Sequence, residues 1–240
     1  MQLQAQAISL EMLPKTADLV LDLGTGPGIC IPELQARYPN VIGCDLDTNM
    51  LNSAKEIAKV VAADAQSLPF KANTFDLIYS NMMLQWARDL TTILKNCFHI
   101  SKIGGEIIAT TLGPQTLKEA RQAMASIGRA ENINNFIDLH IVGDKLHKAG
   151  WQEIFTMTEI VCIEYKCAHD VFKNLKQTSA NKKTNSNVCH DFLSPSTWQV
   201  CLNNYPKTNG KIIATYEVIA IRAKKLLAAN EISIDSITRS

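Results

Sequence analysis

The sequence predicts an α/β protein built on a doubly wound, mostly parallel sheet. Over the first 112 residues, short apolar runs alternate with longer segments whose apolar residues repeat with helical spacing. A glycine-rich turn, residues 24–28, stands where the first apolar run gives way to a helical segment. Because parallel strands need crossover connections, this alternation predicts right-handed strand–helix–strand units that cover both faces of the sheet.

The first half of the chain divides into regularly ordered elements. The apolar runs predict strands at residues 19–23, 41–45, 60–63, 75–80 and 106–111. The helical segments are expected at residues 3–13, 29–37, 49–59 and from the end of the fourth strand through about residue 100. Gly104 and Gly105 mark a turn before the fifth strand.

The pattern changes after residue 112. Helices are expected at residues 115–129 and 141–149, and two longer strands at residues 154–165 and 212–222. A polar stretch, residues 176–190, is typical of a mobile loop, and residues 226–240 are expected to fray.

Composition indicates an ordinary globular chain. Its 240 residues are 46% hydrophobic and 20% charged, which excludes a disordered or fibrous protein. No apolar run approaches the roughly 20 residues needed to span a bilayer, and the start of the chain lacks the features of a secretory signal. We therefore expect a cytoplasmic protein with no membrane partner.

Charge is unevenly distributed along the chain. Residues 1–165 contain 13 Lys and Arg against 18 Asp and Glu, a net of −5, whereas residues 166–240 contain 11 against 5, a net of +6. A basic C-terminal third can attract an acidic partner, and the alternative is a solvated surface.

The seven cysteines suggest neither metal binding nor disulfides. None forms a C-x-x-C pair, so the expected state is a set of reduced thiols packed as small hydrophobic side chains, with no metal site. Cys189 and His190 are adjacent in the polar stretch and are not expected to be catalytic.

The glycine-rich turn is the feature that points to a ligand. Gly24, Gly26 and Gly28 allow a tight turn and let a ligand lie against the backbone. Their G-x-G-x-G spacing differs from the dinucleotide fingerprint, which would need Gly or Ala at Ile29, and Pro27 lacks an N–H for a pyrophosphate. The loop therefore favours a nucleoside ligand without phosphates. The alternative is a tight turn with no ligand.

Polar residues end the next three strands. Asp45 can accept hydrogen bonds from both ribose hydroxyls, and Asp64 can accept one from an adenine amine. Asn81 ends the fourth strand and faces the same crevice, which lies at the carboxyl ends of the strands. The alternatives are a helix cap for Asp45, a role for which Asp47 is better placed, and a turn for Asp64. Together these positions predict one site for an adenine, a ribose and an amino-acid tail.

This set of residues resembles the first motifs of class I methyltransferases that use S-adenosylmethionine. The segment from Asp22 to Gly28 resembles their first motif, Asp45 their ribose-binding acid, and Asp64, next to Ala65, their adenine-contacting acid. The resemblance implies S-adenosylmethionine as cofactor and a seven-stranded Rossmann-like sheet with a C-terminal antiparallel hairpin. It also implies a single domain, residues 1–225. Residues 1–112 would form its cofactor-binding half, and residues 113–225 its substrate-facing half, with an insertion around 112–150.

Other segments resemble the malonyl-acyl-carrier-protein O-methyltransferases of biotin synthesis. The similar segments are residues 64–70, 75–86, 133–136, 138–140, 143–144, 173–176 and 214–218. Asn135 stands where many members have arginine. The resemblance implies methylation of the free carboxylate of malonyl-acyl carrier protein, or malonyl-CoA. The acidic carrier would be steered by the basic C-terminal third, with Lys166, Lys173, Lys176, Lys182, Lys183, Lys207 and Lys211.

This reaction needs no general base. A malonyl carboxylate is already ionised at neutral pH, so catalysis is positioning and desolvation, and no catalytic residue is assigned. Gln85 and Trp86 follow the fourth strand and could shape the acceptor site, as could His140. The alternatives are a core position for Trp86 and a satisfied helix-start histidine for His140.

Two other functions remain open at this point. One is a methyltransferase for a small quinone-type molecule, and the other is a cofactor-binding assembly factor for respiratory subunits that transfers no methyl group. Nucleic acid is not an expected partner, because Asn81 is followed by Met-Met-Leu and not by Pro-Pro and an aromatic residue.

Overall fold

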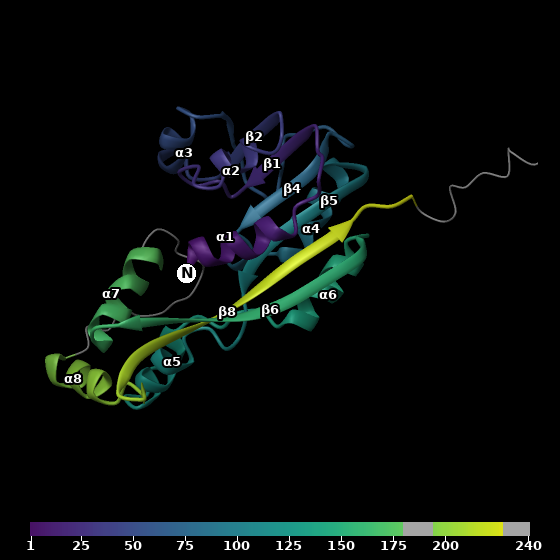
Figure 1. Cartoon of the computed structure of the whole chain (residues 1–240). Coiled ribbons are helices and arrows are strands. Elements are labelled where there is room, and N and C mark those ends of the chain that lie inside the picture. The colour runs from purple at the N-terminus through teal and green to yellow at the C-terminus, as the bar shows by residue number, and fades with distance from the viewer. Residues whose placement is uncertain (180–193, 228–240) are drawn as a thin grey trace, which may run out of the picture.

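The computed structural model describes residues 1–179 and 194–227, whose strands form one sheet (Figure 1). The strand order is β3-β2-β1-β4-β5-β8-β6, and a short strand, β7, pairs with β8. The bounds are β1 Leu19–Leu23, β2 Asn40–Asp45, β3 Lys59–Ala62, β4 Phe75–Asn81, β5 Ser101–Leu112, β6 Gln152–Tyr165, β7 Lys207–Thr208 and β8 Lys211–Lys224. The expectations for Lys182, Lys183, Cys189, His190 and the tail from 228 lie outside the described residues.

The sheet confirms the doubly wound architecture. Strands β3, β2, β1, β4 and β5 pair in parallel, whereas β8 is antiparallel to both β5 and β6. From β1 the chain winds outward through β2 and β3, then returns to add β4 and β5 on the other side of β1. The order therefore reverses between β1 and β4, and the carboxyl ends of these strands are where ligands bind in open α/β sheets.

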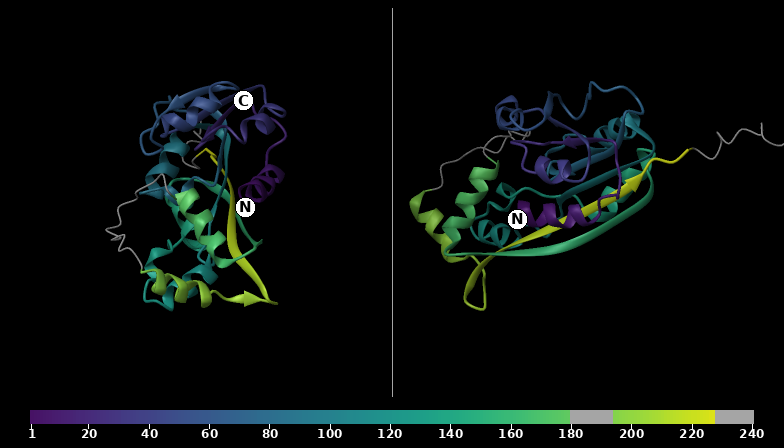
Figure 2. Two further views of the ribbon diagram at one scale, coloured as in Figure 1. Left: turned by 90° about the vertical axis from the view of Figure 1, so that its left-hand side faces the viewer. Right: turned by 45° about the horizontal axis from the view of Figure 1, so that its top comes forward.

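Helices cover both faces of the sheet (Figure 2). On one face α1 packs against β4, β5 and β8, and α2 against β2, while on the other face α4 packs against β5 and α6 against β6. Side chains alternate accordingly along β4, because Leu77 and Tyr79 enter one core and Ile78 the other. The helices are α1 Gln2–Glu11, α2 Ile31–Gln35, α3 Thr48–Ala54, α4 Leu90–Ile100, α5 Lys118–Ala125, α6 Leu139–Lys148, α7 Ala168–Ser179 and α8 Pro195–Asn203.

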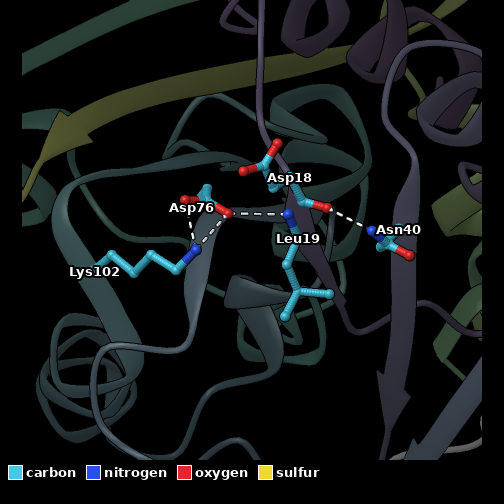
Figure 3. Close-up of polar contacts among 5 residues, drawn as sticks. All are labelled: Asp18, Leu19, Asn40, Asp76 and Lys102. Atoms are coloured by element: carbon cyan, nitrogen blue, oxygen red, sulfur yellow. Dashed lines mark hydrogen bonds and ion pairs between the residues drawn. The ribbon is translucent and has the colours of Figure 1, made fainter.

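Polar contacts hold the strands in register at their amino ends (Figure 3). The Asp76 carboxylate accepts the Leu19 N–H at 2.9 Å and pairs with Lys102 Nζ at 2.9 Å, which joins β1, β4 and β5. Asn40 Nδ2 donates to the Asp18 carbonyl at 3.0 Å and brings in β2. The register of four strands is thus fixed at the edge opposite the carboxyl ends.

Four predicted helices differ from the observed ones. The helix expected at 115–129 is α5 and spans only Lys118–Ala125, because turns flank it on both sides. The helix expected at 49–59 is α3 and ends at Ala54, because residues 55–58 turn and β3 begins at Lys59. The helix expected at 29–37 shortens to α2, since residues 28–30 belong to the turn. The single helix expected after the fourth strand is a 3₁₀ turn, Leu84–Trp86, followed by α4. It breaks because Ala87 is extended and the Asp89 side chain caps α4.

Helices α7 and α8 were not predicted, and residues 176–179 of the expected loop belong to α7. Ser194 and Pro195 carry a start signal for α8: Ser194 Oγ accepts the Thr197 N–H at 3.1 Å, and Pro195 occupies the first turn. Across the two described ranges, no helix combines the length and apolarity that crossing a bilayer requires.

Candidate functional site

The glycines of the turn between β1 and α2 have positive φ but different surroundings. Gly24 has φ +77°, and a Cβ on it would collide with the Met83 side chain. Gly26 has φ +54°, but a Cβ on it would meet no atom within 4 Å. Gly24 is therefore needed for packing, whereas the Gly26 backbone faces open space in which a ligand could lie.

Asp45, at the end of β2, holds this turn in place. Its Oδ2 accepts the Gly26 N–H at 2.9 Å and its Oδ1 accepts the Asp47 N–H at 2.9 Å. A carboxylate offers about four lone-pair sites, so both oxygens keep capacity for hydroxyl donors. Asp47 caps α3 by accepting from Asn49 and Met50, so the cap is Asp47 and not Asp45.

Asp22 lies under the turn and is 2% exposed. Thr25 Oγ1 donates to Asp22 Oδ2 at 2.6 Å. Burial, reinforced by the negative charge of Asp45 and opposed by the Thr25 hydrogen bond, raises the pKa of Asp22 to about 7. This carboxyl supports the turn from inside the protein.

Asp64 and Ala65 follow β3 at the same edge. Asp64 is exposed, and its Oδ1 accepts the Gln66 N–H at 2.9 Å, which is the turn geometry that the alternative interpretation predicted. The Ala65 carbonyl accepts from Asn96 Nδ2 at 3.1 Å, so α4 helps to hold this segment.

The Asn81 side chain is fixed by internal contacts at the end of β4. Its Oδ1 accepts from Thr110 Oγ1 at 2.6 Å, and its Nδ2 lies 3.6 Å from Cys30 Sγ. Thr110 Oγ1 in turn accepts the Met82 N–H at 3.1 Å. Asn81 therefore joins β5 to the start of α2 across the crevice.

The three predicted acceptor-site residues lie in two places. Gln85 and Trp86 are half-buried in the 3₁₀ turn after β4, where Gln85 Nε2 donates to the Met82 carbonyl. Thr111 Oγ1 lies 3.4 Å from Gln85 Oε1. His140 is exposed on the first turn of α6, and its N–H donates to Asp138 Oδ1 at 2.8 Å. Helix α6 packs against α4 and β6, so these contacts do not join His140 to the glycine-rich turn.

Two apolar side chains near the turn were missed in the sequence. Leu46 directly follows Asp45 and is 61% exposed, and Ile29 follows Gly28 and is 50% exposed. Exposed apolar side chains beside an open backbone suit the flat face of a base. The available signal was an apolar residue directly after the acid that ends the second strand.

The prediction that the cysteines are packed as reduced thiols holds for four of the six described cysteines. Cys30, Cys44, Cys97 and Cys201 are buried free thiols, whereas Cys162 and Cys167 are exposed. Burial, with the nearby Asp22 charge, raises the pKa of Cys30 to about 12. Cys30 is therefore a protonated packing residue and not a thiolate nucleophile.

Comparison with known proteins defines the class. A family model described as "Methyltransferase domain" matches residues 21–109. The YcgJ protein of Bacillus subtilis has a TM-score of 0.68 at 13% identity, covering 94% of this chain and 99% of its own. Phosphoethanolamine N-methyltransferase 2 of Haemonchus contortus was solved with S-adenosyl-L-methionine. It has a TM-score of 0.58 at 20% identity, and the match covers 93% of this chain and 52% of that chain. The fold is that of methyltransferases.

Sequence relatives define the family. The malonyl-[acyl-carrier protein] O-methyltransferase of Gallionella capsiferriformans is 32% identical over 88% of this chain and 78% of its own length. The protein of the same name from Legionella pneumophila is 30% identical over 86% and 76%. The biotin biosynthesis bifunctional protein BioHC of Saccharophagus degradans is 35% identical over 71% of this chain and 33% of its own. The chain belongs to the malonyl-[acyl-carrier protein] O-methyltransferase family and is a methyltransferase.

Proposed function

We propose that the chain binds S-adenosylmethionine along the carboxyl ends of β3, β2, β1 and β4. Asp64 and Ala65 would take the adenine and Asp45 the ribose hydroxyls. Asp22, Gly24, Gly26, Gly28 and Asn81 would form or support the part of the site beside the amino-acid tail. The observation that carries this proposal is the open space at Gly26, next to the Asp45 carboxylate that accepts its N–H. A ligand in van der Waals contact with bare backbone fits there.

We further propose that the methyl acceptor is the free carboxylate of malonyl-acyl carrier protein, as the names of its relatives indicate for them. Bound S-adenosylmethionine supplies a methyl group on a positively charged sulfur, and S-adenosylhomocysteine is the product. Because the acceptor oxygen is already anionic, no residue of this chain has to remove a proton. The residues of the chain orient the acceptor and exclude water.

The acceptor side of the proposed site lies beyond β4. Gln85 and Trp86 are our candidates for contacts with the malonyl group, since both follow the strand that ends at Asn81. Gln85 has its amide oriented by the Met82 carbonyl and Thr111. His140 is a weaker candidate for the acceptor side, because it is exposed on α6.

The carrier protein would dock on the basic end of the molecule. Lys166, Lys173 and Lys207 are exposed near α7 and β7, and Lys211, also exposed, pairs with Glu164 at 2.7 Å. Positive charge at this end could steer an acidic carrier toward the site. We also propose that residues 1–225 act as one domain, with the cofactor in the half before 112 and the acceptor in the half that follows.

The test is a methyl-transfer assay. The protein is incubated with methyl-labelled S-adenosylmethionine and either malonyl- or acetyl-acyl carrier protein, and the carrier is analysed for a base-labile methyl ester. Ester on the malonyl carrier alone supports the proposal. Binding of S-adenosylmethionine without any transfer would support a cofactor-binding assembly factor instead. Transfer to small quinone-type acceptors but not to the malonyl carrier would move the acceptor to that class.

A further inference from the structure

Among the described residues, two buried side-chain nitrogens lack a hydrogen-bond partner: Gln6 Nε2, and Nε of Arg121, whose other guanidinium nitrogens donate to backbone carbonyls. Gln6 is 4% exposed, and its Nε2 makes no hydrogen bond with any of the described residues. A buried amide that leaves its donors unpaired costs about 1–3 kcal/mol. A leucine of similar size would fill the same space without that cost, so the amide calls for an explanation.

The surroundings of Gln6 locate it over the end of β4. Ser9, one turn later on α1, contacts the Tyr79 hydroxyl of β4 through its Oγ at 2.7 Å. Ala5, the residue before Gln6, packs in the same cluster as Met82 and Leu112, which lie at the carboxyl ends of β4 and β5. Figure 1 shows the arrow of β4 pointing toward the first half of α1. The buried face of α1 therefore runs from Tyr79 toward the crevice.

The order of the strands indicates which part of the cofactor lies there. Neighbouring strands are about 4.8 Å apart, and the proposed adenine and ribose contacts lie at the ends of β3 and β2. An extended ligand that continues in the same direction brings its amino-acid tail over β1 and β4. Helix α1 packs on β4, so its buried face lies at the tail end of the ligand.

We propose that Gln6 Nε2 donates a hydrogen bond to the carboxylate of the amino-acid tail of S-adenosylmethionine. The inference rests on the proposed function, because it presupposes that this cofactor binds in the crevice. An ionised carboxylate only accepts hydrogen bonds, which matches a group whose free atoms only donate. Hydrogen bonds to charged groups are stronger than those between neutral groups.

The experiment compares two ligands and two variants. S-Adenosylhomocysteine carries the tail carboxylate, whereas 5′-methylthioadenosine lacks the amino-acid tail, and calorimetry measures the affinity of each. We expect Gln6→Leu to bind S-adenosylhomocysteine about tenfold or more weakly and 5′-methylthioadenosine unchanged. The matched control is Gln4→Leu, because Gln4 is exposed on the same helix and should leave both affinities unchanged.

Stability separates this role from a structural one. Removing an unpaired buried amide should leave the thermal midpoint of the ligand-free Gln6→Leu protein equal or higher, whereas loss of a structural contact would lower it. If Gln6→Leu does not fold, Gln6→Met provides the same apolar replacement with an unbranched side chain.

Three results decide the matter. Unchanged affinity for S-adenosylhomocysteine, or an equal loss for both ligands, would overturn the inference about Gln6 and leave the proposed function standing. Wild-type protein that binds neither ligand would overturn the proposed cofactor site itself.

Discussion

The glycine-rich turn and the α5–β8 contact hold their carboxylates in different ways. Before residue 112, Asp22 is bonded to Thr25, three residues away, and Asp45 to Gly26, 19 residues away. After residue 112, Glu119 accepts from the Thr215 N–H at 3.0 Å and from its hydroxyl, 96 residues away. The two carboxylates beside the glycine-rich turn thus bond within 19 residues of the chain, whereas Glu119 of α5 bonds across 96 residues to β8.

This difference separates binding from architecture. A substitution at the open face of the turn should change ligand affinity, whereas one at Asp22, which is buried beneath the turn, should change stability. A substitution at the far end should change stability or partner docking. Four experiments test that separation, from the largest expected effect to the smallest.

Gly26→Val should abolish binding of S-adenosylhomocysteine, with a loss of at least about 100-fold in calorimetry. The valine would occupy the open space above the turn, and φ +54° is unfavourable for it. Gly210→Val is the matched control, since Gly210 also has positive φ, +77°, with nothing within 4 Å, but lies in the turn between β7 and β8. It should lose stability and keep its affinity; retained binding in Gly26→Val would contradict our position for the ligand.

Asp22 should make stability depend on pH. Its pKa is about 7 in the folded protein and near 3.8 when unfolded, so the folded state holds the proton more tightly. Protonated Asp22 therefore contributes its full share of the unfolding free energy below about pH 4, and this contribution is lost as pH rises to about 7. Urea unfolding of wild type and Asp22→Asn at pH 4 to 8 measures it. The difference in unfolding free energy should fall by a few kcal/mol across that range; a flat difference would contradict the buried carboxyl.

Asp45→Asn should weaken S-adenosylhomocysteine binding about tenfold, because an amide has one accepting atom where the carboxylate has two. Fluorescence or calorimetric titration measures the change. Asp138→Asn is the control from the other half: Asp138 also accepts a backbone N–H at the start of a helix, at 2.8 Å from His140. If Asp45→Asn binds S-adenosylhomocysteine as tightly as Asp138→Asn and the wild-type protein do, Asp45 only supports the turn and does not contact the ligand.

Reversing charge at the basic end should have the smallest effect. Lys173→Glu with Lys207→Glu should raise the KM for malonyl-acyl carrier protein several-fold at low salt and leave the KM for malonyl-CoA unchanged. Lys71→Glu, at an exposed site before β4, is the control. If the KM for malonyl-acyl carrier protein does not change, or changes equally at low and high salt, these lysines do not steer the carrier.

Most strands of the first half were predictable from the sequence because short apolar runs between turns have few alternatives. The helix breaks were less predictable: the side chain of Asp89 begins α4, although the helical pattern runs on through residues 84–86. Helices α7 and α8 were missed because their apolar residues Phe172 and Trp198 gain a partner only in the folded core, where the two rings lie 5.0 Å apart.

The sequence by itself determined the glycine turn and the acids that follow it, since backbone conformation at Gly26 and the strand ends depend on nearby residues. Only the tertiary structure decided which hydrogen-bond partners those groups have. It shows that Asp45 also holds the turn and that Asn81 is locked by Thr110. It also buries the Gln6 side chain with its Nε2 unpaired. These contacts join elements distant in the chain, and their geometry exists only once the sheet has formed.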